Sequence, residues 1–322
     1  MEKMKYNLDI QYFAVPEFVP DNVLLMEAKN GVIPAEQGEL VLKEFMANSA
    51  VMQLAKQETM TKPIKKFTYL AEGPGAYWVD EANKIETSKA TWLTAEMEAK
   101  KLGVIIPVSK EFLKWTVPNF FNEVRPAIAE AFYKKFDQAA LFGNETPYAA
   151  NASIWENITN AGNVVVQGTT DNLYTDLNAV LATVEDGDND PDGLVTTRKL
   201  KKDLRGAVDT NMTPIFNEVG QGAANQVLGL PIGYTTGASW DYTKAVAIAG
   251  DWDYARYGIL QGIEYTISED ATLSTVVDEL GEPINLFERD MFALRATMHI
   301  AFITLKEDAF GALTPVVDGE EG

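Results

Sequence analysis

Cysteine is absent from the 322-residue chain, and histidine occurs once, at His299. The lack of cysteine excludes disulfides, thiolate catalysis and cysteine-ligated zinc, and it fits synthesis in a reducing compartment. A Ser–His–Asp triad would have to use His299, and a site built from several histidines is excluded. No run approaches the 18 apolar residues of a membrane span, and the N-terminus has no apolar signal core. These absences predict a soluble intracellular protein.

Positive charge is also scarce, because 27 lysines and arginines stand against 47 aspartates and glutamates, for a net charge of −20. A surface this acidic repels phosphate backbones, so nucleic acid is disfavoured as a direct ligand. It also makes copies of the chain repel one another unless specific contacts offset the repulsion. Hydrophobic residues make up 46% of the chain, which is enough for a substantial core and two subdomains.

The segment "GAYWVDEANKIETSKATW" at 75–92 holds aromatic residues that it cannot bury by itself. Tyr77, Trp78, Ile85 and Trp92 are scattered among charged and small polar residues, although tryptophan is costly to leave in water. The stretch before the segment alternates, and the stretch after it becomes continuously apolar at 104–106. This pattern predicts a projecting two-stranded arm rooted in a core.

Two long elements have clear periodicity. Apolar residues over 117–142 recur at helical spacing before Gly143, which predicts a helix of about 39 Å. Residues 291–304 alternate, which predicts a strand with one apolar face. Short strands and helices alternate between these two elements. The earlier stretch 38–57 has only a loose apolar face, so a core helix and an arm that orders on a neighbouring copy both stay open.

One motif resembles the start of a calcium-binding loop. In "DNDPDG", Asp188, Asp190 and Asp192 match the first ligand positions, and Gly193 follows them. The twelfth position, which needs a bidentate glutamate, is Lys199. A cation at this position favours a solvated turn over a metal site.

The other candidate motifs are weaker still. "GQGAAN" from Gly220 lacks the third glycine of a dinucleotide fingerprint, and His299 fits a structural role in its strand. Asp251 and Asp253 are typical of a capped turn. Basic residues gather locally and predict either solvated helix faces or ion pairs between subunits: Arg125, Lys134, Lys135, Arg198, Lys199, Lys201, Lys202 and Arg205. No catalytic constellation results, so we expect neither an enzyme nor a cofactor or metal site.

Four stretches carry a family resemblance: "PGAYWVDEANKIETSKATW", "KLGVIIPVSKEFL", "IAEAFYKKFDQA" and "INLFERDMFALRATMHIA". In this order they resemble the major capsid proteins of tailed bacteriophages, in particular of phages of Gram-positive bacteria. The resemblance implies the α+β, HK97-like fold. Its implied parts are a peptide at 1–14, an N-terminal arm at 15–60, an extended β-hairpin loop at 61–107, a peripheral domain at 108–165 with a spine helix at 117–142, an axial domain at 166–272, a peripheral return at 273–304, and an axial C-terminal strand and tail at 305–322.

The resemblance also implies a function. Subunits assemble as hexamers and pentamers into an icosahedral head around double-stranded DNA, which they contact only weakly. The implied partners are other copies of the chain, a portal protein and, because only about 60 residues precede the loop, a separate scaffolding protein. No membrane is involved, and the protein resides in the virion after assembly in the host cytoplasm. Tyr77, Trp78, Ile85 and Trp92 would contact neighbouring subunits.

The N-terminal "YNLDIQYFA" resembles a short motif that a host cysteine protease removes from some phage capsid proteins. Leu8, Gln11, Phe13 and Ala14 match it, while Ile10 replaces the usual leucine. We therefore expect cleavage after Ala14.

Two alternatives stay open at this point. A bacterial nanocompartment (encapsulin-type) shell has the same fold, and a cargo-enzyme gene beside this one would favour it. An acidic cytoplasmic enzyme or calcium-binding module is a second class, which the single histidine and Lys199 disfavour.

Overall fold

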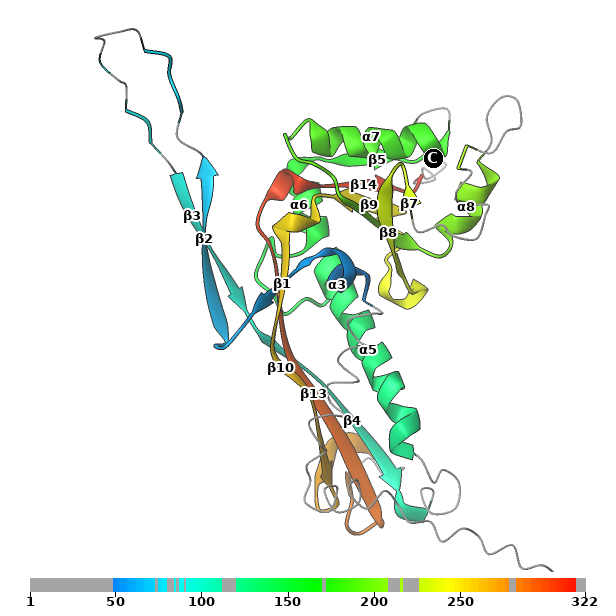
Figure 1. The fold of residues 1–322 in the computed structure, drawn as a ribbon. Coiled ribbons are helices and arrows are strands. Elements are labelled where there is room, and N and C mark those ends of the chain that lie inside the picture. Colours follow the sequence, from blue (N-terminus) through cyan, green and yellow to red (C-terminus); the bar gives the residue numbers. More distant parts are fainter. Residues whose placement is uncertain are drawn as a thin grey trace, which may run out of the picture.

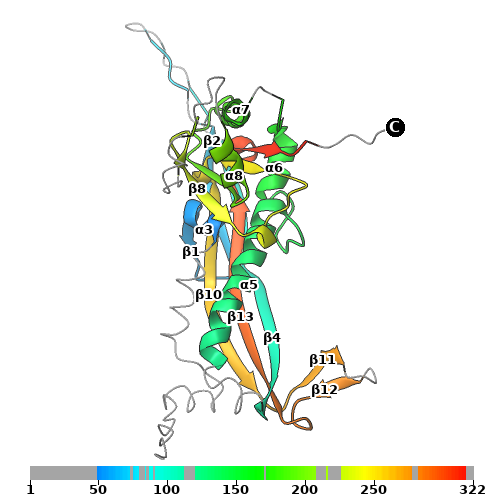
Figure 2. The same cartoon turned by 90° about the vertical axis from the view of Figure 1, so that its right-hand side faces the viewer.

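The computed structural model describes residues 49–72, 75–79, 84, 87–89, 91–111, 120–169, 172–207, 215–216, 226–277 and 282–316. The molecule is elongated, with a six-stranded sheet at one end and long strands running beside a long helix toward the other (Figure 1). A two-stranded hairpin projects to one side of this body. A second, smaller hairpin stands off the far end, as the turned view shows (Figure 2).

A four-stranded sheet in the order β1-β10-β13-β4 forms the long part of the body. β10 (Ala255–Ser268) pairs in parallel with β1 (Lys56–Thr59) and antiparallel with β13 (Met291–Thr304). β4 (Lys100–Ser109) pairs antiparallel with the other side of β13. The strand predicted at 291–304 is confirmed, because its alternate residues from Phe292 to Phe302 are buried.

The long helix α5 (Phe120–Phe142) packs along this sheet, within the range 117–142 predicted for it. Phe136 meets Phe302 of β13 edge-on, with ring centroids 6.1 Å apart. Pro126 lies inside the helix. Gly143 ends it with a φ of +67°, and its N–H donates to the carbonyl of Ala139. Glycine adopts this left-handed conformation without the steric cost of a side chain.

The short helix α3 (Ala50–Leu54) is part of the core, which settles the open question for the end of the 38–57 stretch. Ser49 caps it by accepting the N–H of Met52, and its hydroxyl donates to Asp137 of α5 at 2.5 Å. The Ala50 N–H donates to the same carboxylate at 3.1 Å. Complete burial raises the pKa of Asp137 to about 7, against the lowering effect of these hydrogen bonds.

The six-stranded sheet has the order β5-β14-β9-β6-β8-β7. Helices α7 (Leu173–Glu185) and α8 (Leu200–Gly206) form one apolar cluster with it, and α6 (Ile154–Ala161) joins the main core with α5. Three single 3₁₀ turns lie at Gly237–Ser239, Trp252–Tyr254 and Glu307–Ala309. The strands are β5 (Val164–Val166), β6 (Gly193–Thr197), β7 (Gln226–Val227), β8 (Leu230–Thr235), β9 (Ala247–Gly250) and β14 (Phe310–Thr314).

Strand pairing divides the chain differently from the boundaries that the resemblance implies. Residues 255–268, expected in the axial domain, form β10 and lie in the four-stranded sheet with β13. Residues 100–107, expected in the extended loop, belong to β4 of the same sheet. β10 joins this sheet because it is as long as β13, at 14 residues each. The two strands therefore satisfy the backbone hydrogen bonds of one another. A local sequence pattern does not reveal such a distant partner.

Candidate assembly surface

The projecting hairpin is formed by β2 (Ile64–Glu72), β3 (Thr91–Glu98) and the segment between them. The strands pair antiparallel from Ile64 opposite Glu98 to Glu72 opposite Thr91. Trp92 and Leu93 are 62% and 48% exposed although successive strand residues point to opposite faces. Both faces of the hairpin therefore present apolar side chains to solvent.

Aromatic residues continue onto the outer part of the projecting hairpin. Tyr77 is 55% exposed and Trp78 is 105% exposed, so Trp78 contacts almost nothing in its own chain. The Gly75 N–H donates to the Ser88 hydroxyl at 2.6 Å and links the two limbs. A two-stranded hairpin is only marginally stable alone in water, which makes this exposure costly for an isolated subunit.

Of the predicted contact residues, the structure brings Tyr77, Trp78 and Trp92 onto this one projection. Ile85 lies outside the described residues. The four residues of the predicted processing motif also lie outside them: Leu8, Gln11, Phe13 and Ala14.

Sequence reasoning missed several other exposed apolar residues, among them Leu93 and Phe287. Leu93 points away from Trp92 on the same strand, and a strict alternation count over 91–98 would have found it. Phe287 is 75% exposed in the turn between β12 (Pro283–Asn285) and β13, where the Asn285 side chain accepts the Phe287 N–H at 3.0 Å. β12 forms the smaller hairpin with β11 (Thr272–Val277). No local signal separates this Phe287 from a core aromatic.

The base of the projecting hairpin is fixed by charge and packing. Glu58 of β1 accepts from Lys65 of β2 and from Arg256 of β10, each at 2.8 Å. Burial alone raises the pKa of Glu58, but hydrogen bonds and charges from both partners hold it below its ordinary value. Met60 and Met97 are buried against Ala301 beneath it. Among the described residues, these contacts anchor the hairpin at its base.

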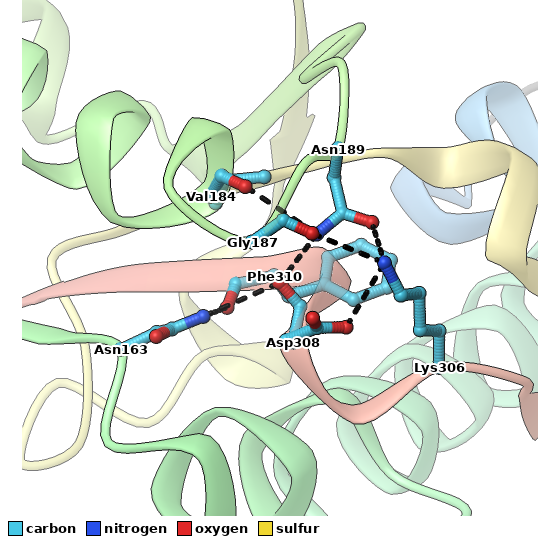
Figure 3. A network of polar contacts seen from close by, with 7 residues as sticks. All are labelled: Asn163, Val184, Gly187, Asn189, Lys306, Asp308 and Phe310. Carbon is cyan, nitrogen blue, oxygen red and sulfur yellow. Dashed lines mark hydrogen bonds and ion pairs between the residues drawn. The ribbon is translucent and has the colours of Figure 1, made fainter.

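The acidic turn that resembled a calcium loop is closed by hydrogen bonds and a lysine (Figure 3). Lys306 donates to the Gly187 carbonyl at 3.2 Å and to Asn189 Oδ1 at 2.6 Å, and it pairs with Asp308. The Asn189 amide donates to the carbonyls of Val184, Gly187 and Asp308. An ammonium group thus occupies the oxygen cluster, and no group of three acidic or histidine ligands exists among the described residues.

The remaining chemical candidates have structural roles. His299 lies mid-strand on β13 between Gln261 and Lys101, and its Nδ1 hydrogen bonds to none of the described residues, so it lacks the acid partner of a triad. Asp251 accepts the Asp253 N–H at 3.1 Å as a capped turn. "GQGAAN" lies outside the described residues. None of the described helices combines the length and the apolar character needed to cross a bilayer.

Known proteins resemble the chain along most of its length. Residues 30–314 match the Phage capsid family. The chain is 43% identical over 319 residues to the major capsid protein of Staphylococcus phage 80alpha, covering 98% of this chain and 96% of that protein. Relatedness of this extent also favours a phage capsid over the nanocompartment alternative.

Solved structures agree. A structure from Microbacterium phage Oxtober96 has a TM-score of 0.74 at 27% identity, covering 84% of this chain and 91% of that one. The capsid of a native GTA particle shares the fold alone, at 13% identity and a TM-score of 0.61, with coverage of 84% and 91%. The mixed α/β fold therefore matches that of HK97-like phage capsid proteins. The chain belongs to the Phage capsid family, and it is a structural protein, the major capsid protein of a tailed phage head, and not an enzyme.

Proposed function

We propose that copies of this chain assemble as hexamers and pentamers into an icosahedral head around double-stranded DNA, and that each projecting hairpin lies over a neighbouring subunit. The observation that carries the proposal is the exposure of Trp78, Trp92 and Tyr77 on a projecting hairpin whose contacts with the body, among the described residues, lie at its base. Monomeric proteins seldom leave such residues in water, whereas interfaces are enriched in them.

The free energy of assembly would come from many copies of the same weak contact. Burying one large aromatic side chain contributes on the order of 2 kcal/mol, and every subunit repeats the same contact. The net charge of −20 opposes association, so a single contact is weak and many are needed together. This balance favours closed particles over small oligomers. Maturation would then shift a helix or loop between two packings.

The sheet architecture supports a domain assignment. We assign the six-stranded sheet with α7 and α8 to the axial domain, including the C-terminal strand β14. The four-stranded sheet with α5 and the smaller hairpin becomes the peripheral domain. The boundary expected at 272 then moves to about 254, where β10 begins.

The partners follow from the same proposal. A scaffolding protein would guide assembly, a portal protein would occupy one vertex, and packaged DNA would contact the acidic chain only weakly. We keep the prediction that a host protease cleaves after Ala14. The intact mass of particle-derived protein tests it, and retention of residues 1–14 would contradict it.

Electron microscopy of the expressed chain, with and without a scaffolding protein, tests the proposal. We expect closed particles from the wild-type chain in at least one condition. Trp78→Ala should leave a folded monomer but lose particles, while Trp78→Phe, which keeps an aromatic surface, should assemble. Soluble monomers of the wild-type chain in both conditions, or normal assembly of Trp78→Ala, would contradict the proposal.

A further inference from the structure

Strand β6 separates two clusters of opposite charge. The strand is buried at all five positions. Residues 185–192, termed the acidic loop, carry five exposed carboxylates: Glu185, Asp186, Asp188, Asp190 and Asp192. Residues 198–205, termed the basic helix, carry one aspartate and five cations, of which all but Lys201 are exposed: Arg198, Lys199, Lys201, Lys202 and Arg205.

The two clusters lie at opposite ends of the six-stranded sheet. Five strand residues span about 17 Å at 3.3 Å each. The Asn189 amide fixes the acidic loop beside the turn that begins β14, at 3.0 Å from the Asp308 carbonyl. β6 runs in the same direction as β14, because both are antiparallel to β9, and α8 follows at its far end (Figure 1). This part of the molecule therefore has a positive end and a negative end.

Within the described part of the chain, both clusters are held in place without ion pairs that would neutralise them. None of the ten side chains forms an ion pair within the described part of the chain. Lys199 and Lys201 place their ammonium groups over the rings of Tyr242 and Tyr234, at 3.8 and 4.0 Å from the centroids. Such cation–π contacts orient the cations without cancelling their charge. On the other side, Lys306 and Asn189 hold the loop backbone.

A ring of identical subunits needs two different surfaces that fit each other head to tail. We infer that the basic helix of one copy docks on the acidic loop of the next copy around each hexamer or pentamer. This inference rests on the ring assembly that the proposed function includes. A second copy of the chain supplies the complementary charge, because its acidic loop lies at the opposite end of the six-stranded sheet from its basic helix. Nucleic acid fits the basic helix less well, because the phosphates of the nucleic acid would be repelled by a chain that is acidic overall.

This contact would fix the relative orientation of neighbouring subunits more than it would add to the free energy of association. Exposed ion pairs are individually weak, and salt screens them, with a Debye length of about 3 Å at 1 M. Like charges would meet if two subunits approached in the wrong orientation, so the clusters select head-to-tail rings.

Charge reversal tests the inference at exposed positions whose side chains form no ion pair among the described residues. Arg198→Glu, Lys202→Glu and Arg205→Glu together change the net charge of the basic helix from +4 to −2, so both ends become acidic. Glu185→Lys, Asp186→Lys and Asp190→Lys together change the net charge of the acidic loop from −5 to +1, so both ends become basic. These positions avoid the lysines that stack on tyrosines, the positive φ of Asp188, and the Asp192 carboxylate that accepts the Trp252 N–H. Arg205 Nε donates to the Lys201 carbonyl at 3.3 Å, a contact within one exposed helix turn. A chain with all six reversals restores opposite ends. Arg198→Lys, Lys202→Arg and Arg205→Lys together keep every charge and form the matched control.

Each variant is expressed with the phage assembly genes and examined by electron microscopy, with circular dichroism and thermal melting of its unassembled form. We expect each triple reversal to melt like the wild type and to lose particles, the sixfold reversal to regain them, and the control to assemble normally. A triple reversal that assembles normally, or a sixfold reversal that does not recover, overturns the inference. So does a basic-helix variant that assembles but packages less DNA. Failure of the wild type itself would instead refute ring assembly.

Discussion

Trp252 and Trp78 are the same residue type in opposite surroundings. Trp252 is 1% exposed, meets Phe310 edge-on at 5.2 Å, and donates its indole N–H to the Gly193 carbonyl at 3.0 Å. Trp78 is 105% exposed on the projecting hairpin. The body thus buries its aromatics within one chain, whereas the hairpin leaves Trp78 in solvent. Under the proposed function, this difference separates residues that fold the subunit from residues that assemble it.

The largest effect is expected in the body. Trp252→Ala removes a buried indole and its hydrogen bond and should lower the free energy of unfolding by about 5 kcal/mol, with a loss of soluble protein. Urea unfolding followed by circular dichroism measures it. A change under about 1 kcal/mol would mean that the body does not depend on this core, and the contrast with Trp78 would collapse.

The buried carboxyl of Asp137 gives the next effect. Its pKa is raised to about 7 in the folded chain, so between about pH 4 and 7 the folded state holds a proton that the unfolded state has released. The free energy of unfolding should therefore fall as pH rises through this window, by about 3 kcal/mol. Asp137→Asn should flatten that dependence. Equal pH slopes for both proteins in urea titrations would contradict this assignment.

The base of the projecting hairpin should respond less. Glu58→Gln leaves Lys65 and Arg256 without their carboxylate and should cost about 1 kcal/mol of unfolding free energy at pH 7. Because the pKa of Glu58 is lowered on folding, this contribution exists above its unfolded value and is lost as pH falls. The wild type and variant should thus converge in stability at acidic pH. Parallel curves down to low pH would argue against the ion pairs.

The smallest effect on stability is expected at the exposed end of the comparison. Trp78→Ala should change the unfolding free energy by less than about 0.5 kcal/mol, because the side chain contacts almost nothing in the subunit. Thermal melting of the unassembled protein checks it. A clearly lowered melting temperature would show that Trp78 supports its own chain.

Local pattern in the sequence predicted the elements that depend on local periodicity. The alternation over 291–304 and the helical spacing before Gly143 are both realised, as β13 and α5. The scattered aromatics around Trp78 correctly predicted a projection. In each case neighbouring residues carry the signal, because period and side-chain size decide which face is buried.

Distant partners could not be predicted in this way. The β10–β13 pairing, the Ser49–Asp137 contact and the role of Lys306 join residues far apart in sequence. The motif "DNDPDG" was predicted to be a turn because Lys199 stands at the twelfth position. The structure instead places Lys199 over the Tyr242 ring, and the lysine that donates into the turn is Lys306, more than a hundred residues away. Periodicity contains no information on such contacts, and only the family resemblance indicated how the parts are arranged.

The central claim is that the projecting hairpin buries its aromatics only on assembly. Oxidative footprinting of tryptophans in unassembled and assembled protein, read out by mass spectrometry, tests it within one sample. We predict that Trp252 is protected in both states, while Trp78 and Trp92 react readily in the unassembled protein and become protected in particles. Equal reactivity of Trp78 in the two states would contradict the account.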